Sequence, residues 1–199
     1  MPTNPISRRD ILRTLAMGAV GGSVLQVIPL AAAEQAHRMV KQEKAQSTTG
    51  AYKPKFFPAH QYATLRLLCD QIIPADEQSG GAIQAGAPEF IDLLTSESKE
   101  YQVDLGGGLM WLDGFCGDRF DSTYVKCSAD QQKQVLDQIA YRKSAENDPG
   151  LSQGVEFFAF LRKLTTDGFY SSEIGIADLQ YQGNTFLREF PGCPPVPEV

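Results

Sequence analysis

The chain has 199 residues, and its 24 acidic residues outnumber its 18 basic ones, which gives a formal net charge of −6 at pH 7. An acidic chain without a basic block is a poor ligand for nucleic acid and for anionic lipid, so we expect neither as a partner. The length suits a single domain with its own hydrophobic core once a leader is set aside.

The first predicted element is an export signal over residues 1–33. Arg8 and Arg9 are adjacent in the run Ser-Arg-Arg-Asp-Ile-Leu, a mildly apolar segment follows over 11–30, and three alanines end at Ala33. Small residues after an apolar segment are typical of a signal-peptidase site, and paired arginines are the motif by which twin-arginine signals are recognised. The sequence therefore predicts twin-arginine export of a folded protein to the periplasm, with cleavage after Ala33.

The same leader allows two other interpretations. An ordinary secretory signal can contain two arginines by chance, but the run over 7–12 and the weakly hydrophobic, glycine-containing segment favour the twin-arginine route. An uncleaved membrane anchor needs an apolar helix of bilayer length. Arg13 and the glycines at 18, 21 and 22 make this stretch a poor span. We therefore expect no direct membrane span after cleavage.

The remainder predicts an all-α fold, a compact bundle of about five helices within a domain over 56–199. Residues 34–55 are polar and predict a flexible tether, of which 34–44 can form a short helix. From residue 56, apolar residues recur every three or four positions, as in helices with one buried face. Pro88 suits a first helical turn, and Ser128 with Gln131 forms a capping box. The predicted helices cover 59–73, 88–96, 99–120, a segment after Ser128 that includes Ala140, and 154–167.

Three consecutive glycines, 106–108, interrupt the predicted helix over 99–120. Each costs roughly 1 kcal/mol relative to alanine inside a helix. A glycine run can bind phosphate, but no Lys-Ser or Lys-Thr follows this one. Close approach of a neighbouring backbone is the better explanation.

The character of the chain changes at about residue 168. Residues 168–184 are turn-rich and aromatic, and Ser171 or Ser172 is a candidate cap for one short helical turn. Four prolines within 190–197 predict an extended arm that cannot be helical, and such an apolar arm is suited to lie on a partner. The candidate partner contacts are Trp111, Phe169, Tyr170 and Tyr181, although Trp111 suits a second core face slightly better.

The sequence contains no recognised motif for catalysis, cofactor binding or metal binding. Gly-x-Gly-x-x-Gly, Gly-x-Ser-x-Gly and His-Glu-x-x-His are all missing, there is no Cys-x-x-Cys-His haem motif, and the histidines are His37 and His60 alone. We therefore expect no catalytic residue, cofactor or metal site on this chain. Proteins exported by the twin-arginine route are already folded and often contain a cofactor, whereas this chain has no cofactor motif. A cofactor-bearing partner that is exported in complex with this chain explains both observations.

Four short motifs occur in a recognisable order. They are Ile-Ile-Pro-Ala-Asp at 72–76, Gly-Ala-Pro-Glu-Phe-Ile-Asp at 86–92, the segment 168–184, and Pro-Gly-Cys at 191–193. Together with the twin-arginine leader, they resemble the gluconate 2-dehydrogenase subunit 3 family, the small subunit of periplasmic flavin-dependent sugar dehydrogenases. The resemblance spans roughly residues 56–193, and the segment 168–184 is similar to the branch paired with glucoside 3-dehydrogenases.

The resemblance implies a helical, non-catalytic subunit. Its large partner would contain FAD in a glucose-methanol-choline oxidoreductase fold and oxidise a sugar hydroxyl, with a cytochrome c as electron acceptor. The small subunit would support folding of that partner and lend it the export signal. Relatives can be disulfide-linked to the large subunit, which makes Cys193 in the extended arm the candidate for that link. An internal Cys116–Cys127 bridge is the competing use of cysteine.

A second hypothesis from another class is a self-sufficient exported ligand-binding protein or enzyme. Its site would lie around Trp111 and the C-terminal aromatic residues, and it would require a closed pocket with convergent polar groups. The two hypotheses differ in what the isolated chain should show, which is exposed aromatic and Pro-rich surfaces in the first case and a closed pocket with convergent polar groups in the second.

Overall fold

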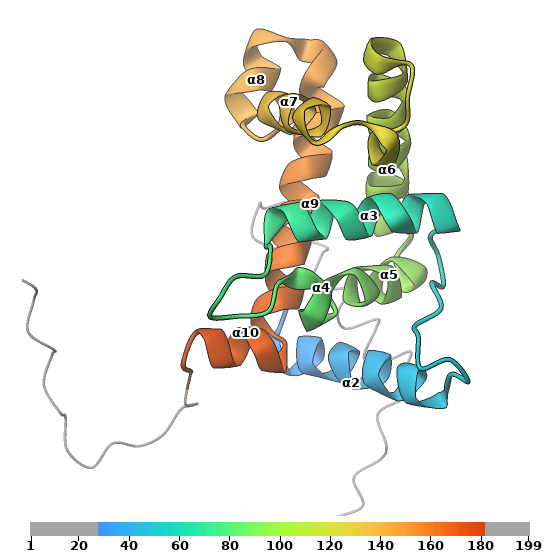
Figure 1. Ribbon diagram of the computed structural model, residues 1–199, viewed down its shortest axis with the longest axis vertical. Coiled ribbons are helices and arrows are strands. Elements are labelled where there is room, and N and C mark those ends of the chain that lie inside the picture. The colour runs from blue at the N-terminus through green and yellow to red at the C-terminus, as the bar shows by residue number, and fades with distance from the viewer. Residues whose placement is uncertain (1–27, 182–199) are drawn as a thin grey trace, which may run out of the picture.

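The computed structural model describes residues 28–181, and no β-strand occurs within that range. The all-α fold expected from the sequence is therefore confirmed. The helices, labelled as in Figure 1, are α2 (Leu30–Gln46), α3 (Ala59–Ile72), α4 (Ala82–Ala85), α5 (Ala87–Glu97), α6 (Lys99–Phe120), α7 (Ala129–Ile139), α8 (Arg142–Asn147), α9 (Ser152–Tyr170) and α10 (Glu173–Asp178), with short 3₁₀ turns η1 (Tyr124–Lys126) and η2 (Pro149–Leu151).

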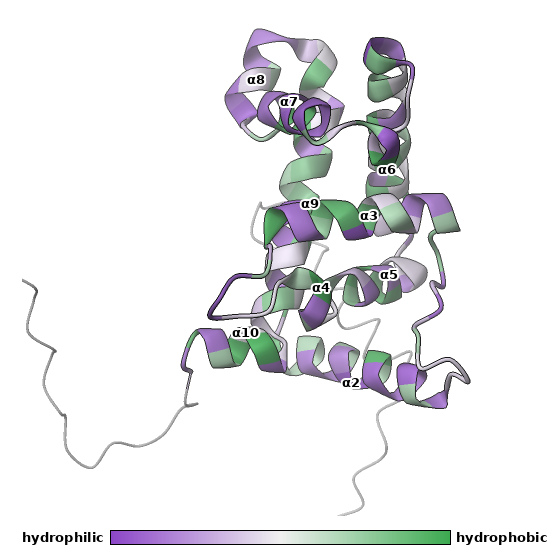
Figure 2. Cartoon of the chain, in the orientation of Figure 1, coloured by the Kyte–Doolittle hydropathy of each residue, from purple (hydrophilic) through white to green (hydrophobic). Residues whose placement is uncertain are grey.

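Helix α9 is the centre of the arrangement and contacts each of helices α3 to α8 and α10 (Figure 1). In the lower half of the view, α2, α5 and α3 lie across it one above the other. In the upper half, α6 runs beside α9, and α7 and α8 pack near the N-terminal end of α9. Figure 2 shows hydrophobic residues along α3 and the middle of α9, whereas hydrophilic residues predominate on α7. The core therefore follows α9.

Local signals account for the helices that the sequence predicts well. Helix α6 has the predicted bounds, and the Ser98 hydroxyl accepts a hydrogen bond from the Tyr101 amide at 3.3 Å at its start. The capping box of α7 is confirmed, because the Ser128 and Gln131 side chains each accept from the other's backbone amide. Such caps satisfy amides that have no partner within the helix.

The segment after the predicted leader differs from the expected flexible tether. Helix α2 starts at Leu30, before the predicted cleavage site, and extends beyond residue 44. It buries Ala33, Ala36, Met39 and Val40 and packs on α5. Two of these side chains are alanines, so the sequence of this helix shows only a weak apolar stripe. For this reason the packing of α2 on the domain was not predicted. The earlier leader residues 1–27, including Arg8 and Arg9, lie outside the described range.

A buried carboxylate fixes the connection between α2 and α3. Asp92 on α5 is fully buried and accepts four hydrogen bonds. They come from the Tyr52 hydroxyl at 2.9 Å and from the amides of Lys55, Phe56 and Phe57 at 2.6, 3.1 and 3.0 Å. Three consecutive amides around one carboxylate are a strong, charge-assisted arrangement. Asp92 therefore determines the path of the loop that enters α3.

The C-terminal part also differs in detail from its prediction. Residues 168–170 belong to the last turn of α9 rather than to a turn-rich segment. Ser172 caps α10, because its hydroxyl accepts from the Gly175 amide at 3.0 Å, whereas Ser171 donates to a backbone carbonyl instead. The predicted Pro-rich arm and Cys193 lie outside the described residues.

Glycines allow α6 and α9 to approach closely. A Cβ atom at Gly108 would lie 2.0 Å from the Phe157 ring, and one at Gly154 would lie 2.2 Å from the Trp111 ring. Real side chains do not tolerate such distances, so both positions require glycine. The predicted close approach of a neighbouring backbone is wrong for the glycine run, because the nearest atoms at all three glycines belong to side chains and only Gly108 has a tight contact, with Phe157.

Candidate partner interface

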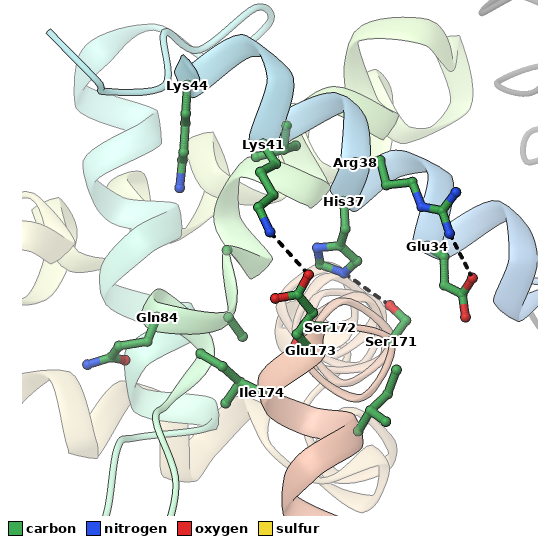
Figure 3. Close-up of a pocket in the computed structure, with 14 residues that line it drawn as sticks. Glu34, His37, Arg38, Lys41, Lys44, Gln84, Ser171, Ser172, Glu173 and Ile174 are labelled. Carbon is green, nitrogen blue, oxygen red and sulfur yellow. Dashed lines mark hydrogen bonds and ion pairs between the residues drawn. The ribbon is translucent and has the colours of Figure 1, made fainter. Parts of the chain in front are cut away.

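The described residues form a pocket of about 430 Å³ beside α2 (Figure 3). Its walls are α2, the corner between α4 and α5, and the start of α10. The three α2 cations on its wall are paired: Arg38 with Glu34 at 3.9 Å, Lys41 with Glu173 at 3.2 Å, and Lys44 with the buried Glu89 at 2.9 Å. The Arg38 pair lies within α2, whereas the Lys41 and Lys44 pairs join α2 to α10 and α5, so these two charges serve packing.

The histidine and serine in this pocket do not form a nucleophile and base. His37 Nε2 lies 3.1 Å from Ser171 Oγ, and Ser171 Oγ donates its proton to the Asp167 carbonyl at 2.6 Å. Because a hydroxyl has one proton, Ser171 accepts from His37 in this arrangement, which is the reverse of base activation. Burial lowers the pKa of His37 despite nearby carboxylates, which favours a neutral ring at pH 7. The ring stacks on Phe90 with centroids 5.0 Å apart.

The other histidine also has a structural environment. His60 Nε2 lies 2.6 Å from one oxygen of Asp113, and the other oxygen of Asp113 accepts from the Tyr124 amide at 3.0 Å. Within residues 28–181, no group of three or more His, Cys, Asp and Glu side chains is placed to bind a metal ion. In the same range, none of the helices combines the length and apolar character that a membrane span requires.

The most distinctive surface is the outer face of α6, formed by Val103, Gly107, Met110, Gly114 and Gly117. These residues recur every three or four positions and therefore share one side of the helix. Val103 is 71% and Met110 67% exposed. In the described part of the chain, no atom lies within 4 Å of a Cβ built at Gly114 or Gly117. These two glycines reduce helix propensity without serving a contact to another element within residues 28–181.

A helix face of this kind suits a protein partner. Glycines without internal contacts let another backbone approach closely, and exposed apolar side chains beside them supply the area that such a contact buries. The sequence analysis did not predict this face, because the more regular apolar stripe of the same helix, from Leu105 to Phe120, is the one expected to be buried. A pattern that indicates this face is present in the sequence: two large apolar residues and three glycines recur at helical spacing on the side of α6 opposite its buried stripe.

The residues proposed from the sequence as partner contacts have different environments. Phe169 is only 2% exposed, so this assignment is corrected: its ring belongs to the core. Trp111 is half-buried between α6 and α9 and stacks on Phe115, which favours the core interpretation. Tyr170 and Tyr181 are exposed at the end of the domain that leads to residues 182–199 and stay predictions. Arg8, Arg9 and Cys193 lie outside the described residues.

Comparison with known proteins gives one match. The protein-family model described as gluconate 2-dehydrogenase subunit 3 matches residues 59–192, which is more than half of the chain and covers the domain from α3 onward. Neither a search of curated proteins nor a search of solved structures found a match at the significance level applied. The family is defined by a subunit of a dehydrogenase complex, in keeping with a surface suited to a partner. The chain belongs to the gluconate 2-dehydrogenase subunit 3 family.

Proposed function

We propose that this chain is the non-catalytic small subunit of a periplasmic, flavin-dependent sugar dehydrogenase. It supports folding of a large subunit that contains FAD in a glucose-methanol-choline oxidoreductase fold, and it carries that subunit through the twin-arginine route. The large subunit oxidises a sugar hydroxyl of the gluconate or glucoside type, and a cytochrome c accepts the electrons. The cofactor supplies the redox chemistry, and this chain supplies a binding surface for the large subunit and the export signal.

The observation that supports this proposal is the exposed face of α6. Val103 and Met110 present apolar side chains to solvent on a domain whose core is already complete around α9. An exposed apolar strip costs solubility and is characteristic of a surface that is covered in a complex. Tyr170 and Tyr181 at the other end of the domain add exposed aromatic surface.

The proposal is tested by copurification. The full chain is tagged at its C-terminus and recovered from periplasmic extract, and the visible spectrum of the eluate is recorded. We expect a large second polypeptide and an absorbance at about 450 nm, which is a property of bound flavin. A colourless chain recovered alone would contradict the subunit proposal.

Met110→Glu is expected to weaken this association at least about tenfold, because a charge is placed in the centre of an apolar contact. Tyr141→Glu is the matched control, since Tyr141 is similarly exposed but lies near the start of α8, away from the α6 face. Recovery of flavin at wild-type levels with both variants would remove the α6 face as the interface while leaving the partner itself in place.

A further inference from the structure

The cleavage site that the leader pattern predicts lies inside a packed helix. Helix α2 begins at Leu30. In its first turn, the amides of Ala32 and Ala33 donate to the Pro29 carbonyl at 2.9 and 3.0 Å. Ala33 is only 2% exposed and belongs to the core cluster. The bond between Ala33 and Glu34 is therefore part of a helical backbone, and the residue before it is buried.

The helical form also separates the two side chains that a signal peptidase recognises. The enzyme requires small residues directly before the cut and two positions earlier, which are Ala33 and Ala31 here. In an extended substrate such residues point to the same side of the strand, whereas in an α-helix they do not share a face. Ala31 is exposed and Ala33 is buried. Helix α2 therefore does not present both side chains to one enzyme surface.

Residues on both sides of this bond pack on the domain. Before it, the partly buried side chains of Ile28 and Ala32 pack against the core. After it, Ala36 is fully buried. A leader that is removed has no need to contribute to the core of the mature protein, whereas the last residues of this one do.

Side chains further along α2 hold the helix in place. His37 Nε2 lies 3.1 Å from Ser171 Oγ (Figure 3), and Lys44 pairs with the buried Glu89 at 2.9 Å. An extended substrate includes residues on both sides of the cut, so α2 has to unwind as far as Ala36, next to His37. Opening the site therefore breaks helical hydrogen bonds and core contacts together.

We propose that the docking of α2 protects the Ala33–Glu34 bond in the folded chain, so that the exported protein retains residues 1–33. Cleavage would add water across this bond and leave a carboxylate on Ala33 and an amine on Glu34. Proteases cut segments that are exposed or locally open. Because the twin-arginine route exports folded chains, α2 is docked before the chain meets the peptidase. The encounter with a signal peptidase rests on the proposed function.

This conclusion differs from the cleavage that the leader pattern alone predicts. The run of three alanines ending at Ala33 has the residue type that a signal peptidase requires. Alanine is also the residue that most favours a helix, and small buried side chains such as Ala33 and Ala36 suit the close packing of α2 on α5. Helix packing therefore explains the alanine run without a cut.

The test compares the purified full chain with a peptide of residues 1–45, each incubated with a signal peptidase in detergent micelles and analysed by mass spectrometry. The peptide lacks the domain on which α2 packs, so we expect it to be cut after Ala33. The folded chain should be cut at least about tenfold more slowly. Equal rates would overturn the proposal. A peptide that is not cut would also overturn it, because the protection would then not come from docking.

Met39→Glu tests the role of docking within the full chain. Met39 is buried on α2, so a charge there weakens the packing of the helix and leaves residues 31–34 unchanged. We expect this variant to be cut at least about tenfold faster than the wild type. Gln42→Glu is the matched control, since the same residue enters an exposed position of the same helix. Faster cleavage in both variants, or in neither, would contradict protection by docking.

The comparison of the wild-type chain with the peptide decides the question even if Met39→Glu fails to fold. Neither the partner subunit nor the export machinery is present in the assay, so its outcome is independent of the subunit proposal. In cells, the intact mass of the chain recovered from the periplasm should include residues before Glu34. A flavoprotein that copurifies with a chain beginning at Glu34 would overturn leader retention alone. A retained leader on a chain without such a partner would contradict the proposed function alone.

Discussion

Replacing Asp92 by asparagine is expected to lower the free energy of unfolding by about 3 kcal/mol or more, a large part of the stability of a domain of this size. The buried carboxylate accepts from Tyr52 and from three consecutive amides, those of Lys55, Phe56 and Phe57. An asparagine side chain has only one acceptor oxygen, and its NH₂ group would face backbone donors. At least one buried amide would then lose its partner and repel its new neighbour.

Urea unfolding followed by circular dichroism measures this effect. The matched control is Asp70→Asn, because Asp70 is an exposed acid on α3 and its replacement should change stability by no more than about 0.5 kcal/mol. Equal losses in the two variants would show that the Asp92 carboxylate does not anchor the loop. The ordering of residues 51–58 by Asp92 would then be contradicted.

Gly108→Ala is expected to destabilise the domain by about 2 kcal/mol, although alanine favours helices by about 1 kcal/mol over glycine. The added Cβ would lie 2.0 Å from the Phe157 ring and 2.7 Å from the Phe157 Cβ. Phe157 is buried, so it cannot turn away without opening the contact between α6 and α9. The overpacking cost therefore exceeds the gain in helix propensity.

Gly114→Ala on the same helix is the control. Nothing in the described part of the chain lies within 4 Å of a Cβ at this position, so the isolated chain should gain about 1 kcal/mol. Thermal unfolding of the two variants should thus shift in opposite directions. A shift of the same sign and size in both would mean that the close crossing of α6 and α9 is not needed for stability.

Local signals explain which parts of the fold were predictable. Helices α3, α5 and α6 have apolar residues at helical spacing, and α7 begins with a capping box, so their positions follow from short stretches of sequence. Helix α2 was missed as a packed element because it buries small residues such as Ala33 and Ala36. Its docking depends on partners far along the chain, including Glu89 for Lys44.

The environment of single residues was less predictable than the helices. Gly168 suggested the end of α9, yet a Cβ there would lie 3.0 Å from Phe90, so this glycine serves the packing of α9 on α5 within a continuing helix. Phe169 then follows the helix into the core. The role of Asp92 depends on amides more than thirty residues away in sequence, and no local pattern indicates such a partner.

The outer face of α6 needed the structure for a different reason. Its residues Val103 and Met110 are visible in the sequence, but exposure is known only once the inward stripe and its neighbours are placed.

We propose that this chain exports a flavoprotein partner, and the most direct measurement is the location of that partner in cells expressing an Arg8→Lys, Arg9→Lys double variant. Cytoplasmic and periplasmic fractions are assayed for the flavin-bearing subunit and for sugar-dependent dye reduction, with Arg13→Lys as the control outside the arginine pair. We expect the partner and its activity to stay in the cytoplasm in the double variant and to reach the periplasm in the control. Normal periplasmic activity in the double variant would contradict it.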